Sequence, residues 1–263
     1  LSDKCYLGKC KSGALKNCAD KTKCSKDSCN TKTGGCIQTP VYENYTCELG
    51  STSLCTSGSC KCRVWSTLFG GSSSDRIYGI AKTNDLGTVS VGTTYVSGKS
   101  YEGYIVRQDK TGKVLWSTTV PGSTSSDYLR AVTATNLKET FIAVGYRYLN
   151  STYKTVGWVV RFTSAGKILS NTTINLSKSD DYLLDIVHDG KGVYYTAGYT
   201  YGLNSNYSSG WMATLNSSGA VTKNSYKHGI LFSPKGGLVH YHYQYNAIAR
   251  YSSYLYLAGT TSQ

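Results

Sequence analysis

The sequence is poor in several residue types and motifs, and each shortage argues against a class of protein. It holds three prolines, one methionine and four histidines in 263 residues, and no cysteine occurs after residue 62. No apolar run reaches 18 residues, so the sequence predicts no membrane-spanning helix. G-x-S-x-G, H-E-x-x-H and phosphate-binding glycine loops are missing, and the acidic residues show no pairing typical of a glycosidase. We therefore expect neither an enzyme nor a cofactor. The chain begins without Met or an apolar leader, so we expect any secretion signal to have been removed or to lie outside it.

The net charge of +13 is spread along the chain instead of being gathered in one segment. No run of five basic residues and no nucleic-acid-binding motif occurs, so we expect no nucleic-acid partner. Dispersed charge of this kind mainly sets solubility and weak association. The alternative is attraction to an acidic polysaccharide or to a neighbouring subunit.

Ten cysteines lie within the first 62 residues, at short spacings. An even number in so short a segment predicts a disulfide framework made in an oxidising compartment, with the pairing left open. A zinc site is the alternative because C-x₄-C occurs at 5–10, 24–29 and 55–60, but zinc thiolates usually need a reducing compartment. We expect no metal. The predicted disulfide residues are Cys5, Cys10, Cys18, Cys24, Cys29, Cys36, Cys47, Cys55, Cys60 and Cys62.

Six N-x-S/T sequons support the same compartment. They predict glycosylation at Asn44, Asn150, Asn171, Asn175, Asn206 and Asn216. One sequon means little in a chain rich in Ser and Thr. Six of them beside a cysteine-rich segment favour a secreted glycoprotein of the extracellular space or the cell surface.

The remaining 200 residues contain an internal repeat. Gly92, Gly145 and Gly198 lie 53 residues apart, each after a short apolar run, and Gly259 follows after 61. Two further sets of glycines keep a spacing of 53–54 residues. They are Gly103, Gly157 and Gly210 before an aromatic residue, and Gly112, Gly166 and Gly219 in a polar turn.

Each repeat predicts four short strands. In the second repeat these lie near Leu129–Thr133, Phe141–Tyr146, Trp158–Phe162 and Ile168–Ile174, with Gly, Asn, Asp and Ser between them. Four strands in about 50 residues is the size of a propeller blade. We therefore predict an all-β fold, a small, four-bladed β-propeller preceded by a disulfide-rich, loop-dominated module.

The segment "RQDKTGKVLWSTTVPGS" carries a resemblance to a known family. With the apolar strand and "V/A-x-G-Y/T-T" before it, residues 63–263 resemble the extracellular β-propeller repeats called SBBP-type. That resemblance implies a propeller fold and says little about function, since such blades serve many roles.

A second resemblance lies in "CADKTKCSKDSCNTKTGGCIQTP" at 18–40. Its cysteines, Asp20, Asp27, Asn30 and Gly34 keep the pattern of the cysteine-rich repeats in slime-mould and other protist extracellular matrix proteins. The resemblance implies a matrix or surface protein with a small disulfide-bonded spacer.

The fourth repeat supplies only two strands, near Asn246–Arg250 and Leu255–Thr260. "VWSTLFGG" at 64–71 matches "LWSTTVPG" at 115–122, and "SLCTSGSCKC" at 53–62 predicts a hairpin turning at Ser57-Gly58. We therefore predict two domains, 1–50 and 51–263, in which 51–69 supplies the outer strands of the last blade and 246–261 the inner ones. The same pairing could form between molecules, giving fibres, or the chain could be a piece of a larger propeller.

Few side chains suggest chemistry. Asp75, Asp127 and Asp181 recur at one place in the repeat, where we favour capping of the turn into each blade over a ring of metal or catalytic groups. "HYH" would place His240 and His242 on one face of a strand as two metal ligands, although a structural role is favoured.

Two functions fit the sequence. We predict a secreted structural glycoprotein, a self-associating subunit of an extracellular fibre, appendage or matrix that assembles through propeller edges and the cysteine module. The alternative is a carbohydrate-binding adhesin, because some of the 24 tyrosines could stack on sugar rings of an acidic or neutral polysaccharide. Variation at Tyr104, Trp158 and Trp211, which occupy equivalent positions, weakens a repeated sugar pocket.

Overall fold

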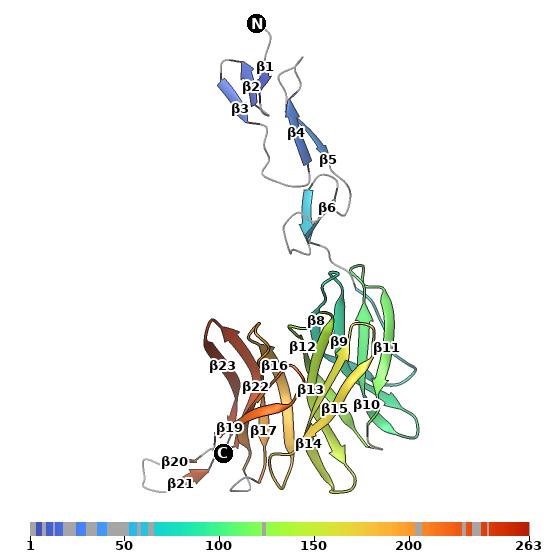
Figure 1. The fold of residues 1–263 in the computed structure, drawn as a ribbon, viewed down its shortest axis with the longest axis vertical. Coiled ribbons are helices and arrows are strands. Elements are labelled where there is room, and N and C mark those ends of the chain that lie inside the picture. The colour runs from blue at the N-terminus through green and yellow to red at the C-terminus, as the bar shows by residue number, and fades with distance from the viewer. Residues whose placement is uncertain are drawn as a thin grey trace. The chain divides into compact units, whose positions relative to one another are not determined.

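The computed structural model describes most of the repeat region and short strands before it. The described residues are 4–6, 9–12, 14–17, 25–29, 36–40, 53–56, 59–62, 66–122, 125–202, 207–227, 230–232, 238–240 and 242–262. They divide into two compact units, Leu1–Ser66 and Thr67–Gln263. All secondary structure in these residues is β (Figure 1).

The first unit is made of short antiparallel strands. They are β1 (Lys4–Tyr6), β2 (Lys9–Ser12), β3 (Ala14–Asn17), β4 (Ser25–Cys29), β5 (Cys36–Pro40), β6 (Ser53–Thr56) and β7 (Ser59–Cys62). Pairing of β6 with β7 confirms the predicted hairpin and sets Cys55 opposite Cys60 in the register. The predicted disulfides involve side chains outside the described part of the structure and stay a prediction.

The described part of the second unit contains three four-stranded antiparallel sheets and two two-stranded sheets, each in chain order. The first sheet is β8 (Asp75–Lys82), β9 (Thr88–Val96), β10 (Ser100–Gln108) and β11 (Val114–Val120). The second is β12 (Asp127–Ala134), β13 (Thr140–Leu149), β14 (Lys154–Thr163) and β15 (Ile168–Ile174). The third is β16 (Asp181–His188), β17 (Tyr194–Thr200), β18 (Ser209–Leu215) and β19 (Val221–Lys227).

The last sheet pairs β22 (His242–Tyr251) with β23 (Tyr254–Ser262), and a small hairpin, β20 (Ile230–Phe232) with β21 (Leu238–His240), precedes it. The four predicted strands of the second repeat and the two of the fourth are thereby confirmed. The result is an all-β, propeller-like series of repeated sheets, in which the first strands β8, β12, β16 and β22 lie next to one another in order.

The core lies between successive sheets. One cluster of buried side chains joins the first and second sheets, and a second cluster joins the second and third. Along β13, Phe141 and Ala143 belong to the first cluster, whereas Ile142 and Val144 belong to the second. Both faces of this strand are therefore buried, which explains why its sequence is a continuous apolar run without polar alternation.

The repeated glycine of the second strand allows a close approach of two backbones. Gly145 pairs with Leu129, and a Cβ at Gly145 would overlap the carbonyl oxygen of Tyr128. The same overlap occurs at the equivalent glycines 92, 198 and 259. The repeat conserves this glycine because a β-bulge in the first strand brings that carbonyl inward.

Candidate functional site

Each of the four first strands carries a β-bulge at the same position, directly after the residue that pairs with the repeated glycine. The register shifts lie between Ile77 and Gly79, Leu129 and Ala131, Leu183 and Asp185, and Tyr245 and Ala247. The four bulged residues are therefore Tyr78, Arg130, Leu184 and Asn246. A bulge redirects one side chain out of the regular alternation of a strand.

All four bulged residues line one cavity of about 340 Å³. Its other lining residues are Gly79, Ile80, Ala131, Val132 and Asp185. The cavity therefore lies where the first strands of the four sheets meet. Its polar groups are one guanidinium, one carboxylate, one phenol and one carboxamide.

Arg130 is the cation of this cavity. Its Cζ lies 4.1 Å from the centroid of the Tyr78 ring, and its Nε is buried without a hydrogen-bond partner. The ring fixes the guanidinium by a cation–π interaction. A buried N–H without a partner is costly, and the Nε atoms of Arg147 and Arg161 share this cost. Arg130 differs from those two arginines because it lines this cavity.

Asp185 is the carboxylate of the cavity, and it also joins two sheets. Its Oδ1 accepts a hydrogen bond from the backbone N–H of Ile186 at 2.8 Å, and its Oδ2 accepts one from Ile248 at 2.9 Å. The second bond holds β22 against β16. A carboxylate offers about four acceptor positions, so capacity remains on the cavity side.

A row of aromatic rings runs across the sheets beside this cavity. In order it contains Tyr95, Tyr101, Tyr128, Tyr146, Tyr182, Tyr199, Tyr201, His242 and Tyr207. Neighbouring ring centroids are 4.6 to 6.3 Å apart. Most members are half-buried, so each presents part of its ring to solvent.

Burial favours the neutral form of three phenols in the middle of this row. Burial raises the pKa of Tyr146, Tyr182 and Tyr199, while the charge of Arg130 opposes the rise at Tyr146 and Tyr199. A hydrogen bond to Tyr78 raises the pKa of the exposed Arg76. The row therefore combines neutral aromatic rings with two guanidinium groups.

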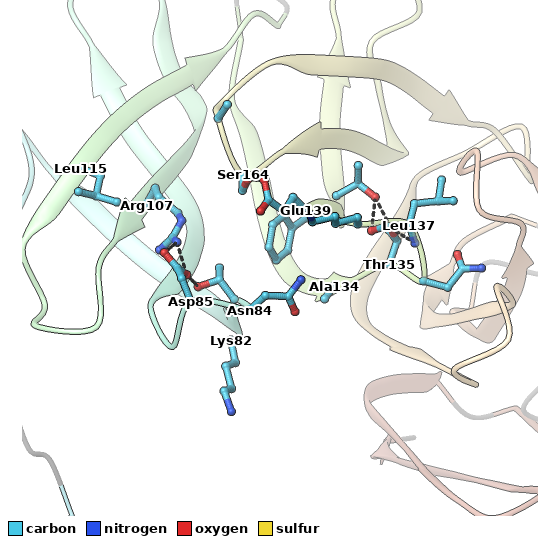
Figure 2. Close-up of a pocket in the computed structure, with 16 residues that line it drawn as sticks. Lys82, Asn84, Asp85, Arg107, Leu115, Ala134, Thr135, Leu137, Glu139 and Ser164 are labelled. Carbon is cyan, nitrogen blue, oxygen red and sulfur yellow. Dashed lines mark hydrogen bonds and ion pairs between the residues drawn. The ribbon is translucent and has the colours of Figure 1, made fainter. Parts of the chain in front are cut away.

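A larger pocket of about 560 Å³ lies between turns of the first and second sheets (Figure 2). Arg107 donates two hydrogen bonds of 2.6 Å to the carboxylate of Asp85, and Glu139 accepts one from Ser164 on the other side. Hydrogen bonds from Thr83 and then Arg107 lower the pKa of Asp85. Arg107, Asp85 and Glu139 already have partners within the protein, so the pocket is a weaker candidate than the cavity around Arg130.

The two ends of the series of sheets expose residues whose equivalents are buried. Val132 and Ile186 are 8% and 4% exposed, whereas Ile80 at the same place in the first sheet is 61% exposed. Ile142 is 0% exposed, whereas Tyr256 at the same place in the last sheet is 56% exposed. The face of β8 and the outer strand β23 are therefore open in the described part of the chain.

Two of the three repeated aspartates cap turns, as predicted. Oδ2 of Asp75 accepts the N–H of Gly71, and Oδ2 of Asp181 accepts those of Leu176 and Ser177. Asp127 is fully buried and forms an ion pair of 3.3 Å with Arg147.

The described sequons lie at exposed positions. Asn150 lies in the turn after β13, Asn171 in β15, Asn175 just after β15 and Asn216 in the turn before β19. Asn171 also uses its amide inside the protein, since Oδ1 accepts Trp158 Nε1–H and Nδ2 donates to the carbonyl of Pro121. Asn44 and Asn206 are outside the described residues, and glycosylation stays a prediction at all six.

The histidine expectation was wrong in its geometry. His240 ends β21 and His242 begins β22, which belong to different sheets. His242 Nδ1 accepts the N–H of Ser208. The described residues contain no group of three or more His, Cys, Asp or Glu side chains that could hold a metal.

The equivalent aromatic residues Tyr104, Trp158 and Trp211 are 9%, 0% and 0% exposed. They pack between sheets and cannot stack on a sugar. Sequence reasoning missed Arg130, although a signal exists. The position three residues after each turn aspartate varies (Tyr78, Arg130, Leu184), while the residue before it is Ile or Leu in all three repeats.

No protein-family model and no curated protein matches the sequence. Among solved structures, two crystal structures of Sqt1 from Chaetomium thermophilum each align with 66% of this chain at 14% identity and a TM-score of 0.33. An ACO/RPE65 chimera aligns with 65% at 12% identity and a TM-score of 0.38. The aligned part spans 44 to 45% of those chains, and the fold described above rests on the sheet topology alone. No helix among the described residues is long and apolar enough to span a membrane.

Proposed function

We propose that this protein is a secreted structural glycoprotein, a subunit of an extracellular fibre, appendage or matrix, whose copies join through the open ends of the series of sheets. The observation that carries the proposal is the exposure of Ile80 and Tyr256, whose equivalents Val132 and Ile142 are buried between sheets. Apolar and aromatic surface of this kind is stabilised when another surface covers it.

The repeat favours a second copy of this chain as the partner that covers the exposed face of β8. Within the chain, Leu129 and Val132 of β12 pack toward the first sheet, and Leu183 and Ile186 of β16 pack toward the second. The face of β8 carries Ile77 and Ile80 at the same places. The β8 face of one copy is therefore suited to pack on the last sheet of another, as successive sheets do inside one chain.

Such a contact is heterologous, because the two surfaces differ. Heterologous contacts give rings when the rotation closes and filaments when it does not. The proposal includes a complete fold, a four-bladed propeller in which the last blade also has four strands. In this proposal residues 51–69 of a neighbouring copy supply the outer strands of the last blade beside β23.

The cysteine-rich segment and the sequons support secretion. They support disulfides in the first unit and glycans on the second, both typical of proteins that persist outside cells. The resemblance of 18–40 to matrix-protein repeats supports the same location. The second candidate is a carbohydrate-binding adhesin, favoured by the half-buried tyrosine row and the cavity beside it.

Light scattering after gel filtration, over a range of concentrations, tests the proposal together with electron microscopy of the native protein. We expect mass to rise with concentration and filaments or rings to appear. Tyr256→Lys places a charge on the open edge and should abolish the rise. Tyr153→Lys is the matched control, because Tyr153 is 83% exposed in a turn away from both ends. A monomeric wild type at every concentration, or equal assembly of both variants, contradicts the proposal.

A further inference from the structure

The four bulges repeat in position, but the side chains that they direct do not. A bulge that serves packing alone accepts residues of different chemical types. Three of the four bulged residues, Tyr78, Leu184 and Asn246, are uncharged and differ from one another in this way. Arg130 alone among them is charged. Its cost is evident, since Nε is buried and no hydrogen bond satisfies it.

The surroundings keep Arg130 unpaired. Lys99 pairs with Glu102, Arg107 with Asp85, and Arg147 with Asp127, and none of these ion pairs includes Arg130. Asp185 lines the same cavity, but its two oxygens face the N–H groups of Ile186 and Ile248. Arg130 is thus held by the Tyr78 ring and not by a carboxylate.

These groups together define the chemistry of a ligand. Arg130 requires an anionic group, and a guanidinium binds carboxylate or sulfate in a fork geometry. Asp185 and Asn246 offer acceptors, which require hydroxyl donors on the same ligand. An inorganic anion supplies no such hydroxyls and would be repelled by Asp185. A sugar acid supplies both.

We propose that this cavity binds an anionic sugar residue of an acidic polysaccharide. The carboxylate or sulfate of the sugar pairs with Arg130, its hydroxyl groups donate to Asp185 and Asn246, and adjoining sugar rings lie on the tyrosine row. The net charge of +13 attracts a polyanion to the protein. This inference concerns a binding site of the single chain and goes beyond the structural role proposed above.

Calorimetric titration of the Tyr256→Lys variant, which removes assembly from the measurement, tests the site. The probes are a galacturonic acid tetrasaccharide, a galactose tetrasaccharide of equal length, and sodium sulfate. We expect the acidic tetrasaccharide to bind at least about 10-fold more tightly than either of the others, since charge-assisted hydrogen bonds add to hydroxyl contacts. Equal binding of the neutral sugar, equal binding of sulfate, or no binding of the acidic sugar overturns the proposal.

Two substitutions locate the site. Arg130→Gln should weaken binding of the acidic tetrasaccharide about 10-fold or more, and Asn246→Ala, at an exposed position, should weaken it by a smaller factor. Arg250→Gln is the matched control, because it removes one charge from an exposed position of β22 outside the cavity lining. Thermal unfolding checks that each variant folds. If Arg130→Gln does not fold, undiminished binding by Asn246→Ala overturns the assignment, as does an equal loss in Arg250→Gln.

Discussion

The indole ring of Trp158 in the second sheet lies against Gly103 in the first, so closely that a Cβ at Gly103 would come within 2.5 Å of it. The relationship repeats along the series. Trp211 lies against Gly157, and the Tyr245 ring lies against Gly210. Each of the three four-stranded sheets therefore carries a glycine that contacts an aromatic ring of the next sheet.

Gly103→Ala tests this stacking. The added methyl group would push against a fully buried indole, and we expect the free energy of unfolding to fall by about 2 kcal/mol, as in other overpacked cores. Urea unfolding measures the change. Gly71→Ala is the control, since the nearest atom to its Cβ is 3.9 Å away, and it should change stability by less than about 0.5 kcal/mol. Equal effects of the two substitutions would show that the ring has room to move.

The turn aspartates should differ in importance according to burial. Asp181→Ala leaves the N–H groups of Leu176 and Ser177 without their partner in a buried place, and we expect a loss of about 2–3 kcal/mol. Asp75 is partly exposed, so water can replace it for Gly71, and Asp75→Ala should cost less. Both losses are measured by urea unfolding. A larger loss for Asp75→Ala would contradict the capping explanation.

The tyrosine row predicts a loss of stability at alkaline pH. Burial raises the pKa of Tyr146, Tyr182 and Tyr199 above the ordinary value of 10.0. At pH 8 these phenols are neutral in both states. As pH rises past 10.0 the unfolded chain ionises first, and stability falls. Tyr199→Phe keeps the ring, removes the hydroxyl and should flatten the fall. Unfolding free energies at pH 8 to 11 measure it, and an unchanged slope in Tyr199→Phe would refute the prediction.

Much of the fold could be predicted because the same pattern of apolar strands and glycines occurs in each repeat. The run around Gly145 is apolar on both faces because Phe141 and Ile142 are buried by different neighbouring sheets. Three sets of glycines at a spacing of 53–54 residues gave the length of the repeat, and the apolar runs between polar segments gave its four strands.

The site was harder to predict because a bulge leaves no signature in one strand alone. In the sequence Arg130 looks like an ordinary strand residue. Its place in a β-bulge follows from the register of β12 with β13, where Gly145 lies against the Tyr128 carbonyl. The histidine expectation failed for a related reason. Residues 238–242 look like one strand, but the sheet changes between His240 and His242.

Hydrogen exchange of the β23 amides, Tyr254–Ser262, at low and high protein concentration tests the central claim most directly. An open strand edge exchanges quickly, and pairing with a second copy slows it. We predict that protection of these amides rises with concentration while that of the buried strand β13 stays constant. Equal protection of β23 at every concentration would contradict the account, because no second copy would then be covering the open edge.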